Sequence, residues 1–157
     1  MIAQPVLDTL ISMADKEAEQ LAVRLANAVR AHEENTRKLA MLLQYREDYA
    51  ERYQQGMTRG VDITHHVNFR EFLGKLDEAI GGQQGLVEQT GRRLQHKRDA
   101  WQEAERKRQS WTTLAGRAQQ ARLKQEQRRE QKASDEHAAG MTRRSGDWRN
   151  ESSGSDC

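Results

Sequence analysis

His65 and His66 are the residues whose type most directly suggests chemistry, because imidazole nitrogens are common metal ligands. Neighbouring residues of a loop or strand point apart, and no carboxylate or cysteine stands at ligand spacing around the pair. The sequence also has no Ser/His/Asp set, no glycine-rich phosphate-binding loop and no Cys/His cluster. We therefore expect these histidines to lie in a solvated loop of a protein that is not an enzyme and needs no metal ion or cofactor.

A seven-residue apolar repeat dominates the rest of the sequence, and such a repeat is typical of coiled coils. We call its a and d positions the seam. The first pass has Ile11, Ala18, Leu25, His32, Leu39, Arg46 and Tyr53 at a, and Leu7, Ala14, Leu21, Ala28, Asn35, Leu42 and Tyr49 at d. The second pass has Leu73, Ile80, Val87, Leu94, Trp101, Arg108 and Ala115 at a, and Phe69, Leu76, Gln83, Thr90, Lys97, Ala104, Trp111 and Ala118 at d.

The composition supports a narrow seam and not a globular core. Of the 157 residues, 32% are charged and only 5% are aromatic, which is too little apolar material for a compact multilayer core. Two long helices joined by a short turn bury both seams only by folding back on each other. The predicted fold class is therefore all-α: two long helices in an antiparallel coiled-coil hairpin, followed by a disordered C-terminal tail.

The predicted hairpin spans residues 1–138. We expect helix one over about 5–55, the turn over about 56–67 and helix two over about 68–135. Residues 139–157 contain glycines and serines and are expected to be disordered.

Local signals support these boundaries. Asn68 and Glu71 have the spacing of a capping box that would start helix two. Gly81 and Gly82 lower helix propensity within it. A break at these two glycines, giving three helices, is the alternative, although the heptad continues across them unshifted.

Polar residues interrupt both seams. A buried polar group in a coiled coil requires a partner that satisfies it, so we interpret these residues as setting register and orientation. A ligand or metal site is the alternative. The interruptions are Asn35, His32 and Arg46 in helix one, and Gln83, Thr90, Lys97 and Arg108 in helix two.

Apolar residues beside the seam predict a second apolar surface in the half of the hairpin near the turn. Exposed apolar surfaces of this kind often mark a protein partner, and a broadened intramolecular seam is the alternative. The residues are Tyr45, Val29, Leu43, Met57 and Met41 from helix one, and Phe72, Ala79, Leu86 and Leu114 from helix two.

Charge is distributed unevenly along the chain. Residues 92–132 carry 13 basic and 5 acidic side chains, a net charge of +8, whereas the whole chain carries only +2. Nucleic-acid binding is one interpretation, but the block has no aromatic residues outside the seam on which bases would stack. We therefore expect no nucleic-acid partner. With no apolar run of about eighteen residues and no secretory leader, we also expect no membrane span and a cytoplasmic location.

The pattern resembles the FliJ family of the bacterial flagellar type III export apparatus. The resemblance covers about residues 1–136. It rests on the string Leu39-Ala-Met-Leu-Leu-Gln-Tyr-Arg-Glu-Asp-Tyr49, the glycine-bearing turn, the string Asn68-Phe-Arg-Glu-Phe-Leu-Gly-Lys-Leu-Asp-Glu-Ala-Ile80, and the run Arg106-Lys107-Arg108 with Trp101, Trp111 and Leu114 near it.

The resemblance implies a central stalk in the hexameric ring of the flagellar export ATPase. It also implies contacts with the cytoplasmic domain of the membrane export gate and with flagellar export chaperones, at the inner face of the cell membrane. A nucleic-acid-binding hairpin and a generic self-associating coiled coil are the alternatives.

Two sets of residues follow from the resemblance. The export gate would contact Leu42, Tyr45, Tyr49, Phe72, Leu76 and Ala79, although Lys38 and Gln83 beside them differ from the family pattern. The ATPase ring would receive the other end of the hairpin, with Leu7, Leu21, Leu25, Trp101, Arg108 and Trp111.

Overall fold

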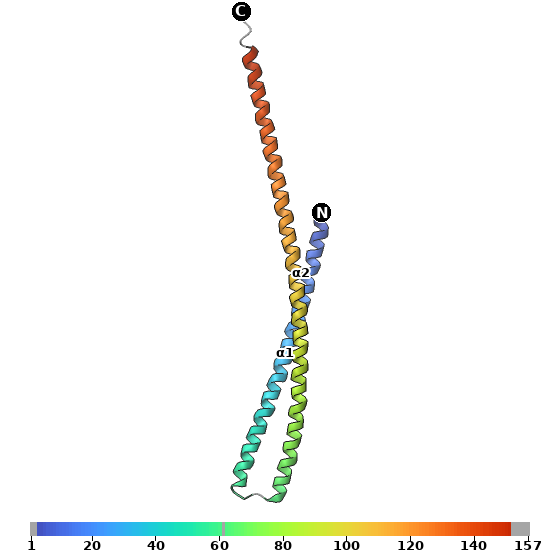
Figure 1. The fold of residues 1–157 in the computed structure, drawn as a ribbon, viewed down its shortest axis with the longest axis vertical. Helices are drawn as coiled ribbons and strands as arrows, with labels where there is room; N and C mark the ends of the chain where they lie inside the picture. Colours follow the sequence, from blue (N-terminus) through green and yellow to red (C-terminus); the bar gives the residue numbers. More distant parts are fainter. Residues whose placement is uncertain (1–2, 61, 152–157) are drawn as a thin grey trace, which may run out of the picture. The chain divides into compact units, whose positions relative to one another are not determined.

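The protein forms two long α-helices in a computed structural model that describes residues 3–60 and 62–151, with side chains up to residue 146. Helix α1 spans Gln4–Met57 and α2 spans Ile63–Glu151 (Figure 1). The chain divides into two units at the bond between Gln109 and Ser110, inside α2. The prediction of an all-helical hairpin is confirmed.

The seam is where the predicted heptads put it. In the first unit, every a and d residue is buried or half-buried in both helices. The most deeply buried residues of the described chain all lie at these positions, and they are Leu7, Ala14, Ala18, Ala28, Leu76, Ile80 and Ala104. The core of the hairpin is therefore one narrow apolar line between two helices.

Contacts across the seam show that the helices run antiparallel. The rings of Tyr53 and Phe69 stack with centroids 3.7 Å apart near the turn. Farther along, His32 Nδ1 lies 3.1 Å from Thr90 Oγ1. Residue numbers rise along one helix as they fall along the other, as the ribbon shows (Figure 1).

The size of the seam residues changes along the hairpin. Near the turn the seam contains the rings of Tyr49, Tyr53 and Phe69. Far from the turn it contains the buried alanines Ala14 and Ala104. Because the spacing of packed helices depends on the side chains between them, the aromatic end holds α1 and α2 farther apart. The two ribbons separate near the turn accordingly (Figure 1).

The turn is shorter than the sequence predicts. Thr58 caps α1, and its hydroxyl donates to the Gln55 carbonyl oxygen at 2.7 Å. Gly60 has φ +81°, a left-handed conformation that glycine adopts without strain. Asp62 starts α2, because its carboxylate accepts from the Ile63 amide at 2.8 Å and its carbonyl accepts from the His66 amide at 3.2 Å.

The predicted capping box at Asn68 and Glu71 is wrong, because both residues lie inside α2. The predicted loop position of the two histidines is wrong as well. His66 occupies an a position one heptad before Leu73. The centroids of the His66 and Tyr53 rings are 5.5 Å apart. Because histidine is polar, the apolar repeat does not include His66, and the sequence therefore predicts the start of α2 about one turn too late.

Helix α2 runs without interruption through Gly81 and Gly82, so the three-helix alternative is excluded. At its other end it extends to Glu151, past the end predicted near residue 135. No proline opposes this extension, because the only one, Pro5, lies in the first turn of α1. The last part of the predicted tail, residues 152–157, lies outside the described residues.

Polar seam residues are paired across the two helices. Gln83 Nε2 donates to the Asn35 carbonyl oxygen at 2.9 Å and to its side-chain oxygen at 3.3 Å. The Thr90 hydroxyl donates to carbonyl oxygens of its own helix, so it is left to accept from His32 Nδ1 in the tautomer that carries the proton there. These two pairs fix the register of α1 against α2, because sliding one helix along the other breaks both pairs at once.

Gly82→Ala is expected to raise the free energy of unfolding by about 1 kcal/mol, since alanine is the better helix former and a Cβ there meets no atom within 4 Å. Gly60→Ala is the matched control and should lower it, because φ +81° is unfavourable for alanine. Urea denaturation followed by circular dichroism measures both. A loss of stability in Gly82→Ala would contradict the packing described above.

Tyr53→Phe is expected to leave the hairpin as stable as the wild type or to stabilise it by up to about 1 kcal/mol. The Tyr53 hydroxyl is buried and has no hydrogen-bond partner among the described residues. Tyr45→Phe is the control, because the Tyr45 side chain is half-exposed and its hydroxyl is free to bind water. Thermal unfolding compares the two, and a clear loss of stability in Tyr53→Phe alone would reveal a partner for its hydroxyl.

Candidate functional site: a turn-proximal apolar patch

Six residues that the resemblance assigns to the export gate occupy one stretch of the hairpin near the turn. Their spacing of three or four residues puts each set on one face of its helix. We call them the turn-proximal patch: Leu42, Tyr45 and Tyr49 from α1, and Phe72, Leu76 and Ala79 from α2.

Aromatic rings join the two halves of this patch. Tyr45 meets Phe72 edge to face with centroids 6.1 Å apart, and Tyr49 lies 4.6 Å from Phe72. Tyr45 and Tyr49 are themselves 6.4 Å apart along α1. Such arrangements are favourable for aromatic pairs and hold the rings in fixed positions. The structure thus brings residues about thirty positions apart into one cluster.

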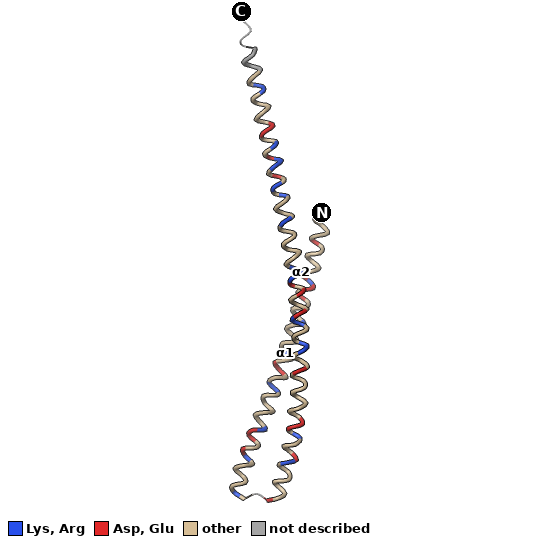
Figure 2. Tube along the Cα trace, in the orientation of Figure 1, with Lys and Arg blue, Asp and Glu red and all other residues tan. Residues whose placement is uncertain are grey.

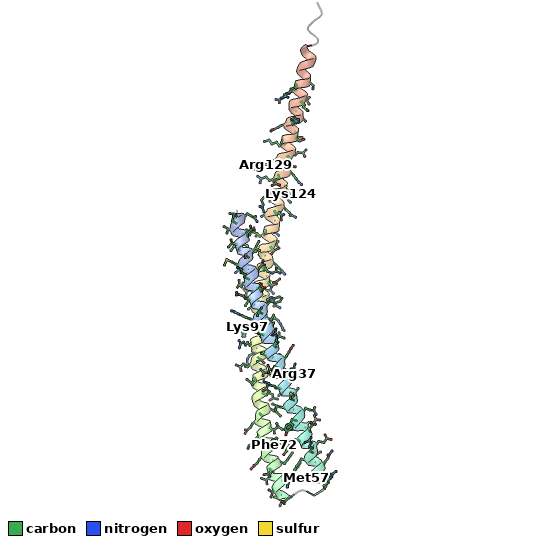
Figure 3. The ribbon with its side chains drawn as sticks, turned by 180° about the vertical axis from the view of Figure 1, so that it is seen from behind. Arg37, Met57, Phe72, Lys97, Lys124 and Arg129 are labelled. Carbon is green, nitrogen blue, oxygen red and sulfur yellow. The ribbon has the colours of Figure 1, made fainter. Side chains whose placement is uncertain are left out.

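The patch is partly open to solvent. Tyr45 is 50% exposed and Phe72, labelled in Figure 3, is 37% exposed. Ala79 is also exposed, while Leu42 and Tyr49 are half-buried and Leu76 is only 7% exposed. Leu76 therefore lies beneath the patch, and Tyr45, Phe72 and Ala79 form its exposed surface.

The wider apolar surface predicted beside the seam is largely exposed. Val29 is half-buried and therefore broadens the intramolecular seam, which was the alternative to a partner surface at this residue. The remaining large residues of this surface in the first unit are at least 37% exposed, and they are Met41, Leu43, Tyr45, Met57, Phe72 and Leu86. Exposed apolar side chains at this density favour an interaction surface.

An ion pair crosses the seam beside the patch. Arg46 Nε lies 2.6 Å from Asp77 Oδ1, and this hydrogen bond raises the pKa of the Arg46 guanidinium. Sequence analysis identified Arg46 only as an interruption of the seam and did not find its partner. The pair could have been found from the heptad, because Arg46 stands at an a position and Asp77, of opposite charge, at an e position of the facing helix.

All six residues proposed for the ATPase ring stand at a or d positions of the predicted seam. Leu7 is 1% exposed, and Leu21, Leu25 and Trp101 are half-buried, as is Trp111 in the second unit. Leu7 therefore has almost no surface to offer a partner.

Arg108 is the charged member of that set. It pairs with Glu105 one turn earlier on α2, and its Nη1 lies 3.9 Å from Asp15 Oδ1 on α1. The hydrogen bond to Glu105 raises the pKa of Arg108, and the same bond lowers the pKa of the Glu105 carboxyl. Arg108 thus joins the two helices at this level of the hairpin.

The second unit consists of the continuing α2 helix, where every residue from 119 to 139 is exposed. Basic side chains are frequent along it (Figure 2). Those in the first part of this stretch are Arg122, Lys124, Arg128, Arg129 and Lys132.

Other kinds of site are not found in the described part of the chain. Residues 3–60 and 62–146 contain no group of three or more His, Cys, Asp or Glu side chains placed to hold a metal ion. Among the described residues, neither helix has a stretch long and apolar enough to cross a membrane.

Comparison with known proteins gives one family. The model of the flagellar FliJ protein family matches residues 4–147. The flagellar FliJ protein of Escherichia coli (strain K12) is 29% identical over 138 residues, which cover 88% of this chain and 94% of the relative. The FliJ protein of Salmonella typhi is 28% identical over the same shares. No solved structure matches. Because the family model covers nearly the whole chain, this protein belongs to the flagellar FliJ protein family.

Proposed function

We propose that this protein is the central stalk of the flagellar export ATPase ring and links that ring to the membrane export gate. As a FliJ family member it is a non-enzymatic component of the flagellar export apparatus. On this proposal it works in the cytoplasm, at the inner face of the cell membrane, and also contacts export chaperones. The observation that carries the link to the gate is the turn-proximal patch with its exposed aromatic rings.

The shape of the first unit supports a mechanical role. Two helices that share one seam make a stiff support, since bending it separates paired seam residues. The patch lies near the turn, whereas Leu7, Leu21 and Leu25 lie toward the opposite end of α1. One rod thereby offers different residues to two partners.

Ring binding on this proposal depends on the outer faces of the helices. The first-unit seam residues Leu7, Leu21, Leu25, Trp101 and Arg108 contribute by holding the helices in position, because most of their surface is already covered. Trp111, which belongs to the second unit, is half-buried. The exposed basic side chains of residues 119–132 add charge that complements an acidic surface.

Adding this protein to the purified export ATPase is expected to increase ATP turnover several-fold, because a stalk stabilises the assembled ring. Steady-state hydrolysis and co-elution of the two proteins measure this. The proposal fails if turnover is unchanged and the proteins elute separately. Submicromolar, steeply salt-dependent binding to nonspecific DNA or RNA would instead support the nucleic-acid alternative.

Tyr45→Ala and Phe72→Ala are each expected to weaken binding to the cytoplasmic domain of the export gate by about tenfold or more, as loss of an aromatic anchor does. Helicity by circular dichroism should stay close to wild type. Met13→Ala is the matched control, because Met13 is 61% exposed on the same helix but lies in the half of α1 away from the turn. The proposal is contradicted if both variants keep the wild-type affinity for the gate domain. A large loss of helicity would show that the two rings stabilise the hairpin core.

A further inference from the structure

Ion pairs join the two helices of the first unit at several levels. Lys107 Nζ of α2 lies 3.9 Å from Glu17 Oε2 of α1. Near the turn, Arg46 of α1 pairs with Asp77 of α2. Complementary pairs of this kind fix partner and orientation in coiled coils. Another level of the hairpin brings together cations alone.

At that level three cations from both helices line one groove. Arg24 of α1 and Arg93 and Lys97 of α2 surround a cavity of about 360 Å³, and Lys97 is labelled in Figure 3. No acidic side chain lines it. Within the described residues, none of the three cations takes part in an ion pair.

The groove is hollow because its α1 wall is made of small residues. Ala28 and Ala31 line it where a larger side chain would fill the space. Asn27 adds a neutral amide, which donates hydrogen bonds to an anion. The Thr90 hydroxyl also lines the groove but is already bonded to its own helix and to His32. Four donor groups are therefore available: two guanidiniums, one ammonium and one amide.

We propose that this groove binds a multivalent phosphate anion, either free or as the phosphate chain of a nucleotide. Guanidinium groups bind phosphate oxygens in pairs, and lysine adds a compact positive charge. One carboxylate would neutralise only one of the three cations. A phosphate chain carries several charges, and its tetrahedral oxygens accept from donors on both helices at once.

The anion also contributes to the stability of the hairpin. Like charges held at one level repel each other, and Lys97 is half-buried in the seam, where water screens it less. A ligand that binds only where α1 and α2 meet stabilises the folded protein in proportion to its concentration. Removing one cation relieves the repulsion and weakens the site at the same time.

Pyrophosphate binding to the full-length protein is tested by calorimetric titration and thermal unfolding at constant ionic strength. The wild type should bind and gain melting temperature. Arg93→Gln should melt higher than the wild type without anion at low salt and bind pyrophosphate at least about tenfold more weakly, from loss of a charge-assisted contact. Arg129→Gln, which removes an exposed cation outside the groove, is the matched control and should bind like the wild type.

Further probes define the ligand. ATP without magnesium that binds as pyrophosphate does identifies the phosphate chain as the ligand, and tighter ATP binding identifies a nucleotide. Citrate, a multivalent carboxylate, should bind more weakly than pyrophosphate. The proposal is overturned if citrate binds equally well, if Arg93→Gln binds like the wild type, or if Arg129→Gln loses as much affinity as Arg93→Gln.

Discussion

Burial of one narrow line of side chains between α1 and α2 is the interaction on which the rest of the structure depends. Each helix contributes mainly its a and d residues, and the deeply buried ones are alanines, leucines and one isoleucine. Such a seam supplies little apolar burial per residue compared with a globular core. The polar pairs Asn35 with Gln83 and His32 with Thr90 then select one alignment among those that the apolar residues alone would allow.

A seam this narrow leaves most of each helix facing solvent. Near the turn the exposed side chains include a set of apolar and aromatic residues, with Tyr45 and Phe72 among them. At the level of Ala28 the seam residue is small, and the charged side chains that line the groove are all positive. The same constraint therefore yields two unlike surfaces on one hairpin. Side chains not required to hold the helices together are available to bind partners.

The seam was predictable from the sequence, because a period of 3.5 residues needs no knowledge of the partner helix. The start of α2 was not predictable, because a histidine at an a position gives no apolar signal. Only the structure shows that the His66 ring packs against Tyr53. The six residues of the turn-proximal patch were named from the family resemblance, whereas the ring contacts of Tyr45 and Tyr49 with Phe72 and the burial of Leu76 emerged only from packing. The basic groove was missed, since Arg24 and Arg93 come together only once the stagger of the helices is known.

Oxidative footprinting of the full-length protein, with and without the purified cytoplasmic domain of the export gate, tests whether the turn-proximal patch binds that domain. Side-chain labelling reports exposure at single residues, so Tyr45 and Phe72 can be compared with Met13, which is 61% exposed in the half of α1 away from the turn. We predict that the gate domain protects Tyr45 and Phe72 and leaves Met13 unchanged. Unaltered labelling of both rings in a formed complex, or protection of Met13 in their place, would contradict the account.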